Sequence, residues 1–112
     1  MIVQVLHELT NRTKNGQLVW TKEYYEAGVF VHNALHAKCG VDELWLITET
    51  HDKITLRHEE AVLITTHSTD APDAIAVREL HSACLIQIYE QDERDKAVAA
   101  EHLASVLGIG VD

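Results

Sequence analysis

The sequence predicts a single α+β domain spanning residues 1–112, with an N-terminal helix, an antiparallel meander of three or four strands, and a C-terminal helix or helix pair packed on the sheet. Apolar residues near both ends of the chain recur at the three- and four-residue steps of a helix. The middle of the chain instead holds short β-branched and aromatic runs separated by polar breaks, which is typical of strands. A chain of 112 residues can bury one modest core.

The first element is expected to be a helix from Ile2 to Lys14. Asn15 and Gly16 would end it in a left-handed turn, and Leu18 and Trp20 would anchor the chain just beyond. A competing interpretation makes Asn15-Gly16 a hairpin turn between two strands. We favour the helix because apolar or small side chains recur on one helical face: Ile2, Leu6, Leu9 and Thr13.

The segment from Tyr24 to Ala37 fits a strand or a helix. As a helix it would be capped by Thr21, would carry Lys38 in its last turn and would stop at Gly40. We favour a strand, because Val29-Phe30-Val31 is rich in β-formers and Gly28 weakens a helix. One face of that strand would carry Tyr25, Ala27, Val29, Val31, Leu35 and Ala37, and the other Glu26, Gly28, His32 and His36.

Three further strands are predicted, and a meander places them side by side in an antiparallel sheet. They run from Glu43 to Glu49, from Ile54 to Arg57 and from Ala61 to Thr66, with a turn at residues 50–53. If His51 and Asp52 form a two-residue loop, the register follows. Ile47 would then face Leu56 and Trp45 would face His58, while the other face would carry Leu44, Leu46 and Arg57.

The last part of the chain is predicted to be helical. Asp70 to Asp73 is a good helix start, with an acidic cap and Pro72 in the first turn. Residues 91–96 are polar on every side, so they form either an exposed turn of one long helix or a break between two. The segment from Ala97 to Leu107 is helical again, with Gly108 as its stop. An inner stripe would hold Val77, Leu80, Cys84 and Ile88, and an outer one Ala100, Leu103 and Leu107.

The composition limits the classes of partner and the location that we expect. Eighteen acidic and nine basic residues give a net charge of −9, which disfavours nucleic-acid binding and suits a protein partner with a basic surface. The apolar runs are too short for a membrane span, and the N-terminus lacks the pattern of a signal peptide, so we expect a cytoplasmic protein. The sequence indicates no cofactor.

The one spacing that resembles a metal site is His32-x-x-x-His36-x-x-Cys39. On a helix these side chains would share a face and could hold zinc. On a strand the two histidines lie about 13 Å apart. We therefore expect no metal, and we expect Cys39 and Cys84 to be buried free thiols. The eight histidines are otherwise scattered along the chain.

No catalytic site is predicted. The five glycines form none of the G-x-S-x-G, phosphate-loop or dinucleotide motifs. His81 and Ser82 would be adjacent on a helix and would point in different directions, and Glu59-Glu60 sits at a strand margin where surface charge is the ordinary explanation.

Two segments resemble a set of uncharacterised small bacterial and phage proteins. Residues 9–20, LTNRTKNGQLVW, resemble their opening helix, glycine stop and tryptophan, and Arg78-Glu79-Leu80-His81 resembles the start of their closing helix. His81 departs from the aromatic residue usual there. The resemblance implies the order helix, antiparallel meander, helix, and it implies no activity or functional residues.

We therefore expect a small acidic, non-enzymatic protein that binds and inhibits another macromolecule, as immunity proteins, antitoxins and phage anti-defence proteins do. The alternatives are a small-ligand-binding protein at an oligomer interface and a small metal-dependent or hydrolytic enzyme. The strand from Glu43 to Glu49 is apolar on both faces, so one face would lie bare unless the N-terminal helix covers it. That face, or the stripe ending at Leu107, predicts a homodimer.

Overall fold

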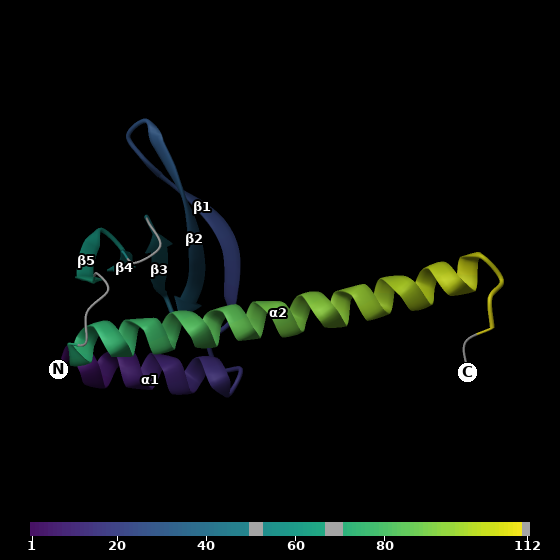
Figure 1. The fold of residues 1–112 in the computed structure, drawn as a ribbon, viewed down its shortest axis with the longest axis horizontal. Coiled ribbons are helices and arrows are strands. Elements are labelled where there is room, and N and C mark those ends of the chain that lie inside the picture. The colour runs from purple at the N-terminus through teal and green to yellow at the C-terminus, as the bar shows by residue number, and fades with distance from the viewer. Residues whose placement is uncertain (50–52, 67–70, 111–112) are drawn as a thin grey trace.

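The computed structural model describes residues 1–49, 53–66 and 71–110. It is an α+β fold in which a five-stranded antiparallel sheet, ordered β1-β2-β3-β4-β5, lies against two helices (Figure 1). Both helices pack on the same face of the sheet, so the molecule has two layers. The elements are α1 (Ile2–Lys14), β1 (Trp20–Ala27), β2 (Phe30–Cys39), β3 (Asp42–Thr48), β4 (Ile54–His58), β5 (Ala61–Thr66) and α2 (Pro72–Val106).

The predicted N-terminal helix is confirmed with its boundaries. The hairpin alternative is wrong, because the residues before Asn15 form a helix and not a strand. Gly16 follows the helix with a φ of +73°, a conformation that L side chains rarely adopt. The hydroxyls of Thr10 and Thr13 are satisfied inside the helix by the carbonyls of Leu6 and Leu9, each at 2.8 Å. Polar atoms on the buried face of α1 are thereby paired.

The segment from Tyr24 to Ala37 is extended, as favoured, but it is divided between two strands, so the sheet has five strands and the predicted number of three or four is wrong. Gly28 and Val29 form a two-residue hairpin turn between β1 and β2, and Gly28 takes a φ of +63°. The turn reverses the chain, so the predicted grouping of Tyr25 with Leu35 on one face is wrong. Tyr25 pairs with His32, and both lie on the face away from Leu35.

The β3–β4 register differs from the prediction by one residue. Leu46 lies opposite Leu56, Ile47 opposite Thr55 and Trp45 opposite Arg57. Because side chains alternate with a period of two, this shift moves the whole of β4 to the other face. The predicted loop residues His51 and Asp52 lie outside the described residues.

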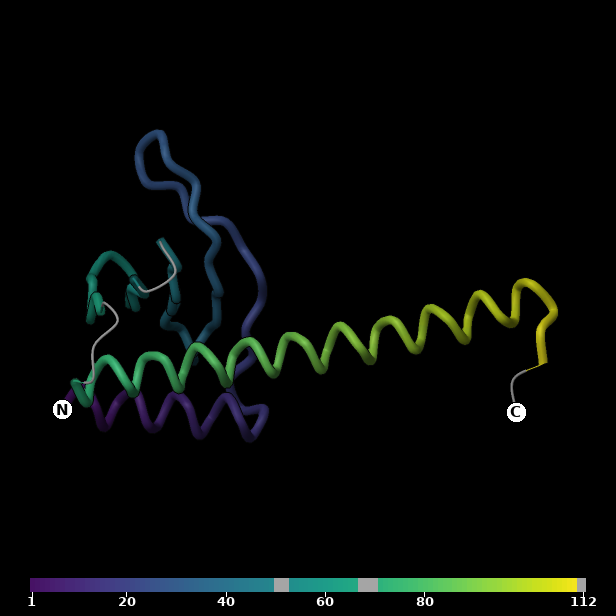
Figure 2. Tube along the Cα trace, viewed as in Figure 1, coloured from purple at the N-terminus to yellow at the C-terminus, as the bar shows by residue number. Residues whose placement is uncertain are grey.

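α2 is one uninterrupted helix, so the prediction of a helix pair is wrong and the alternative of one long helix is confirmed. Ala71 occupies its N-cap position, whereas Asp70 lies outside the described residues. Gly108 follows the helix with a φ of +75°, as expected for a stop. The tube in Figure 2 shows the first half of α2 running beside α1 and the second half leaving the body.

The core lies between the sheet and the two helices. All four residues of the predicted inner stripe are buried, and so are Leu18 and Trp20. The fully buried large side chains come from α1, the loop after it, two central strands and α2: Leu6, Leu18, Leu46, Leu56, Val77, Leu80 and Cys84.

Gln87 is a polar link in this packing. Its amide nitrogen donates to the carbonyls of Thr13 at 3.0 Å and Leu18 at 2.8 Å, and its oxygen accepts from the backbone N–H of Trp20 at 2.8 Å. Trp20 in turn donates from its indole nitrogen to the Thr13 hydroxyl at 2.9 Å. One side chain of α2 thus joins the end of α1, the loop and the start of β1.

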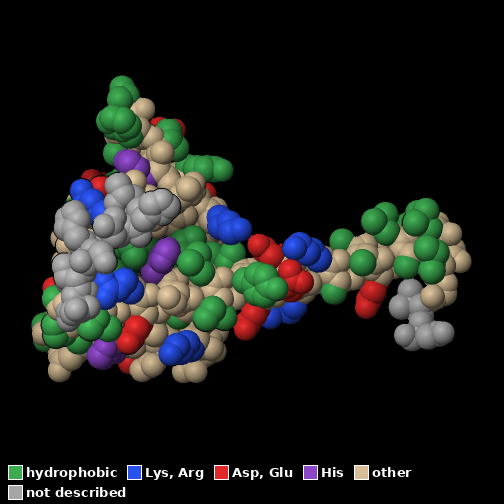
Figure 3. All heavy atoms as spheres, viewed as in Figure 1, with side chains coloured by type: hydrophobic (Ala, Val, Ile, Leu, Met, Phe, Trp, Pro, Cys, Tyr) green, Lys and Arg blue, Asp and Glu red, His purple; other side chains and the backbone are tan. Residues whose placement is uncertain are grey.

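The molecule is elongated, with principal extents of 55 × 34 × 30 Å. The long axis follows α2, whose second half stands clear of the body (Figures 1 and 3). Among the described residues, no helix is both long and apolar enough to cross a membrane.

Candidate binding surfaces

The outer face of the sheet, opposite both helices, carries the first candidate site. Four side chains from β1, β2, β3 and β4 meet there, each of them half-buried: Tyr25, His36, Trp45 and Arg57. We call them the outer cluster. No described helix lies over this face, and each of the four side chains keeps part of its surface accessible to a partner.

The outer cluster is held together by ring contacts. The Tyr25 ring meets the edge of Trp45 with centroids 5.5 Å apart, and the His36 ring tilts against Trp45 at 4.4 Å. The Arg57 guanidinium lies over the Tyr25 ring at 5.5 Å, within the range of a cation–π contact. These contacts fix the side chains before any partner arrives, which lowers the entropic cost of binding.

Two buried nitrogens in the outer cluster have no hydrogen-bond partner among the described residues. They are His36 Nε2 and Arg57 Nε. The nearest carboxylate oxygen to the histidine nitrogen belongs to Glu43, at 3.6 Å, which is too long for a hydrogen bond. Most buried polar groups in proteins are paired, so unpaired ones on an open face call for an explanation.

The tip of the β1–β2 hairpin is a second exposed apolar surface. Val29, Phe30 and Val31 are 91%, 67% and 60% exposed, and Tyr24 is 73% exposed. The Phe30 ring stacks on His32 with centroids 6.4 Å apart. In Figure 1 this hairpin extends furthest from the helices.

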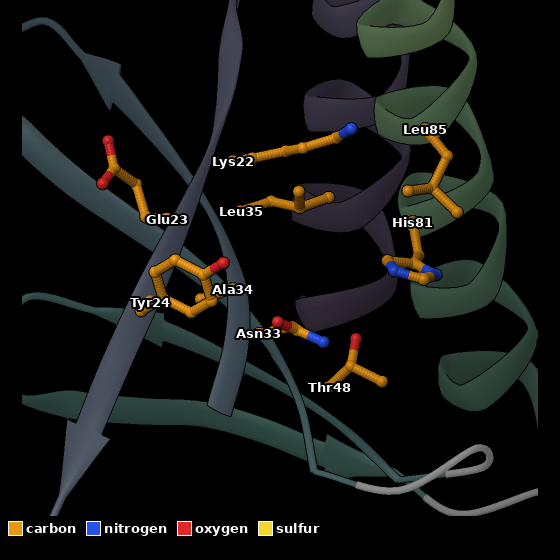
Figure 4. A pocket seen from close by; sticks show the side chains of 9 residues that line it. All are labelled: Lys22, Glu23, Tyr24, Asn33, Ala34, Leu35, Thr48, His81 and Leu85. Carbon is orange, nitrogen blue, oxygen red and sulfur yellow. The ribbon is translucent and has the colours of Figure 1, made fainter. Parts of the chain in front are cut away.

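A groove between the β1–β2 hairpin and α2 is a third candidate, with a volume of about 410 Å³. Figure 4 shows Lys22 and Leu35 pointing from the sheet toward α2, where His81 and Leu85 form the opposite wall. Burial lowers the pKa of His81 below its ordinary value, so the neutral ring is favoured. The groove therefore combines apolar walls with a neutral imidazole and one amine, a mixture that small-molecule sites use.

The residues of the possible zinc site are not brought together. His32 and His36 lie on the outer face of β2, four residues apart, whereas Cys39 faces the helices and packs against the core. His36 instead belongs to the outer cluster. Extended geometry separates the two histidines by roughly 13 Å.

One other group of side chains has the spacing of metal ligands among the described residues. Asp42, His58 and Glu59 each offer an atom, and these atoms lie within 4.8 Å of one another. Asp42 already contacts His58 at 3.0 Å, and Glu59 accepts from the backbone N–H of Glu43 at 2.9 Å. Internal hydrogen bonds thus explain the grouping.

The residues considered for catalysis are also placed. Ser82 is exposed on α2, and the neighbouring His81 is half-buried and faces the groove, so the two do not act together. Cys84 is a free, fully buried thiol, as predicted, and burial raises its pKa far above neutrality. Cys39 is also free but only half-buried, so the prediction that it is buried is wrong in degree. Glu59 and Glu60 are exposed at the β4–β5 turn.

Comparison with protein-family models, with curated proteins and with solved structures finds no match for this chain. Function is therefore argued from these surfaces. The outer cluster was not predicted from the sequence, because its four residues come from four strands. The signal that could have indicated it is the position of Trp45 on an apolar strand face that the closing helix does not cover.

Proposed function

We propose that this protein is a small, non-enzymatic binding protein whose outer cluster docks another protein. The observation that carries the proposal is a preorganised group of tryptophan, tyrosine and arginine side chains on a sheet face that no described helix covers. These three residue types dominate the binding energy of protein interfaces.

The charge of the molecule supports a partner with a basic rim. The chain carries a net charge of −9, and Glu23 and Glu43 lie on the same sheet face as the outer cluster. Complementary charge around a buried centre speeds association and selects the partner. Binding that blocks the partner, as immunity proteins, antitoxins and phage anti-defence proteins do, is the form of this function that we propose.

Two substitutions in the outer cluster test the proposal. The partner is first isolated from the producing cell with the intact protein and then purified. We expect Trp45→Ala and Arg57→Ala each to weaken its binding by about thirtyfold or more, measured by isothermal titration calorimetry. Val41→Ala, at a turn residue that is 95% exposed, should leave the affinity unchanged.

Folding must be checked in the same variants, because Trp45 is half-buried. Arg57→Ala removes only a half-buried side chain and keeps the ring contacts between Tyr25 and Trp45. If both folded variants bind the partner as tightly as the intact protein, the outer cluster is not the docking site and the proposal fails.

The groove beside α2 supports small-ligand binding as a second candidate function. Its volume and its mixed lining fit a small molecule better than they fit a protein surface. A ligand of defined mass that stays bound through purification in native mass spectrometry, and that is lost in Leu85→Arg, would favour this candidate.

A further inference from the structure

Among the described residues, no helix or strand packs against the part of α2 beyond Asp92. The last buried residue of the helix is Ile88, and the last ion pair between the helix and the body, among the described residues, joins Asp92 to Lys22 at 3.5 Å. From Glu93 to Val106 every residue except Ala104 is exposed. Isolated helices shorter than about 12–15 residues are marginal in water, and this projecting segment is of that length.

One stripe of α2 runs unbroken from the body to the outer end of the helix. Its members are spaced by alternating steps of four and three residues, the pattern of a coiled-coil seam: Ser82, Ile86, Tyr89, Glu93, Lys96, Ala100, Leu103 and Leu107. We call this stripe the α2 seam. Its large apolar members are 57–69% exposed. Figure 3 shows charged side chains on the middle of the projecting helix and hydrophobic ones toward its end.

The α2 seam faces away from the body. A helix turns about 100° per residue, so Ile86 lies roughly 160–180° around α2 from Cys84 and Val77, which are fully buried. The sheet and α1 therefore leave the seam open along its whole length. A second helix can lie on the seam, and its end would reach the body at the hollow that Ser82 and Ile86 line together with Lys14 of α1.

The α2 seam is complementary to a second copy of itself that runs in the opposite direction. If two copies pack antiparallel about a two-fold axis between Arg94 and Asp95, Ile86 meets Leu103 of the second copy and Tyr89 meets its Ala100. Glu93 then meets Lys96 of the second copy, and the charges are opposite. Every contact occurs twice, as a two-fold interface requires.

Other arrangements of the same two helices are worse. A parallel pair would place Glu93 against Glu93 and Lys96 against Lys96 in the seam, and like charges there are repulsive. Shifting the antiparallel pair by one heptad would place Glu93 against Leu103 or Tyr89. Charged groups would then be buried against apolar ones without partners.

The body offers a place for the end of the second helix. The reversed register brings Leu107 of the second copy to Ser82, beside a shallow hollow of about 370 Å³ that Ala83, Ile86 and Lys14 help to line. α2 has no basic residue in its last turn to balance the partial negative charge of its C-terminal end. Lys14 supplies a positive charge at that point.

We infer that the α2 seam is the interface of an antiparallel homodimer of this chain. The interface does not use the residues of the outer cluster, so the dimer can be tested independently of the proposed docking function. A dimer interface also explains why α2 continues to Val106 although no residue beyond Ile88 belongs to the core.

Light scattering and sedimentation equilibrium at micromolar concentration test the inference on the full chain. We expect a mass of about 25 kDa, twice the 12.6 kDa of one chain. Glu93→Lys alone and Lys96→Glu alone each place like charges in the seam and should raise the dimer dissociation constant by about tenfold or more. Glu101→Lys makes the same charge change on an exposed position outside the seam and should leave the constant unchanged.

A mixture of the two single variants separates contact between copies from contact within one helix. Glu93 and Lys96 also pair within one chain at 3.2 Å, and that pair stays broken in both variants. Across copies, the mixture restores opposite charges, so we expect a mixed dimer about as tight as the intact one. A parallel dimer would instead make the mixture much tighter than the intact protein.

Several outcomes would overturn the inference. One is a mass of 12.6 kDa that does not rise with concentration. Another is a dimer that persists unchanged in Leu103→Asp, because the copies would then meet on another surface. A mixture that stays as weak as its separate components, or that binds much more tightly than the intact chain, would also contradict the antiparallel register.

Discussion

At the scale of single residues, Gln87 has more structural effect than its sequence position suggests. A glutamine on a helix is ordinarily a solvated residue, and nothing in the spacing of the chain distinguishes it. In the structure it bonds to three backbone groups, at the end of α1, in the loop after it and at the start of β1. Side-chain bonds to the main chain in loops depend on tertiary approach, so sequence patterns do not predict them.

Replacing Gln87 with leucine should therefore destabilise the fold. The Leu18 carbonyl and the Trp20 N–H would lose their Gln87 partner, and the Thr13 carbonyl would keep only the Gly16 N–H at 3.2 Å. We expect the free energy of unfolding to fall by roughly 2–4 kcal/mol. Urea denaturation measures it. Gln91→Leu, one turn later and exposed, should change stability by less than about 0.5 kcal/mol. Equal effects of the two substitutions would show that the link contributes little.

His81 should make stability depend on pH. Burial lowers its pKa in the folded protein, so the unfolded chain binds the proton more tightly. The free energy of unfolding should then fall as the pH drops below about 6.5, the ordinary histidine pKa, and should be highest above it. In His81→Gln the fall between pH 7 and pH 5 should be smaller than in the intact protein.

The control is His102→Gln, at an exposed position of α2, which should leave the fall unchanged. A stability profile of His81→Gln that overlays the profile of the intact protein would contradict this account.

At the scale of elements, local sequence patterns predicted the helices, which depend on residues close in sequence. They failed to predict strand boundaries and strand register, which depend on turns. The periodicity of α1 and the inner stripe of α2 identified both helices. A helix that buries one face needs an apolar residue on that face in every turn, and this pattern is visible in the sequence. The alternation from Tyr25 to Ala37 continues through the Gly28-Val29 turn, so two strands look like one. The register of β3 on β4 depends on the length of the connection, and a change of one residue exchanges the faces.

The observed register makes a measurable prediction. Leu46 and Leu56 lie opposite each other on the face that meets the helices and are both fully buried. Each Leu→Ala change should cost on the order of 2–5 kcal/mol, and the pair should be non-additive by about 0.5–3 kcal/mol. The control pair, Ile47→Ala with Leu56→Ala, lies on opposite faces and should be additive within about 0.5 kcal/mol. Strong coupling in the control pair would restore the register expected from a two-residue loop.

At the scale of the whole molecule, the fold class and the order of elements follow from composition and periodicity, whereas the layers do not. The sequence left open whether α1 covers the second face of the sheet. The structure places both helices on the same face, so no described helix covers the face that carries Trp45. The outer cluster could not be predicted, because its members are far apart in sequence and their shared face depends on three strand registers.

The straightness of α2 through residues 91–96 has a geometric consequence for the pair of molecules we propose. With the axis between Arg94 and Asp95, the centres of the two bodies would stand on the order of 40 Å apart along the helices, at 1.5 Å per residue. An unbroken helix holds that spacing, whereas a flexible joint would let it vary. Two identical docking faces at a fixed spacing form a bivalent receptor, which gains most on targets that repeat at the same interval. The polar middle of α2 would then set the distance between the two docking faces. Targets with a different repeat distance would bind to one face only, with the affinity of a single site.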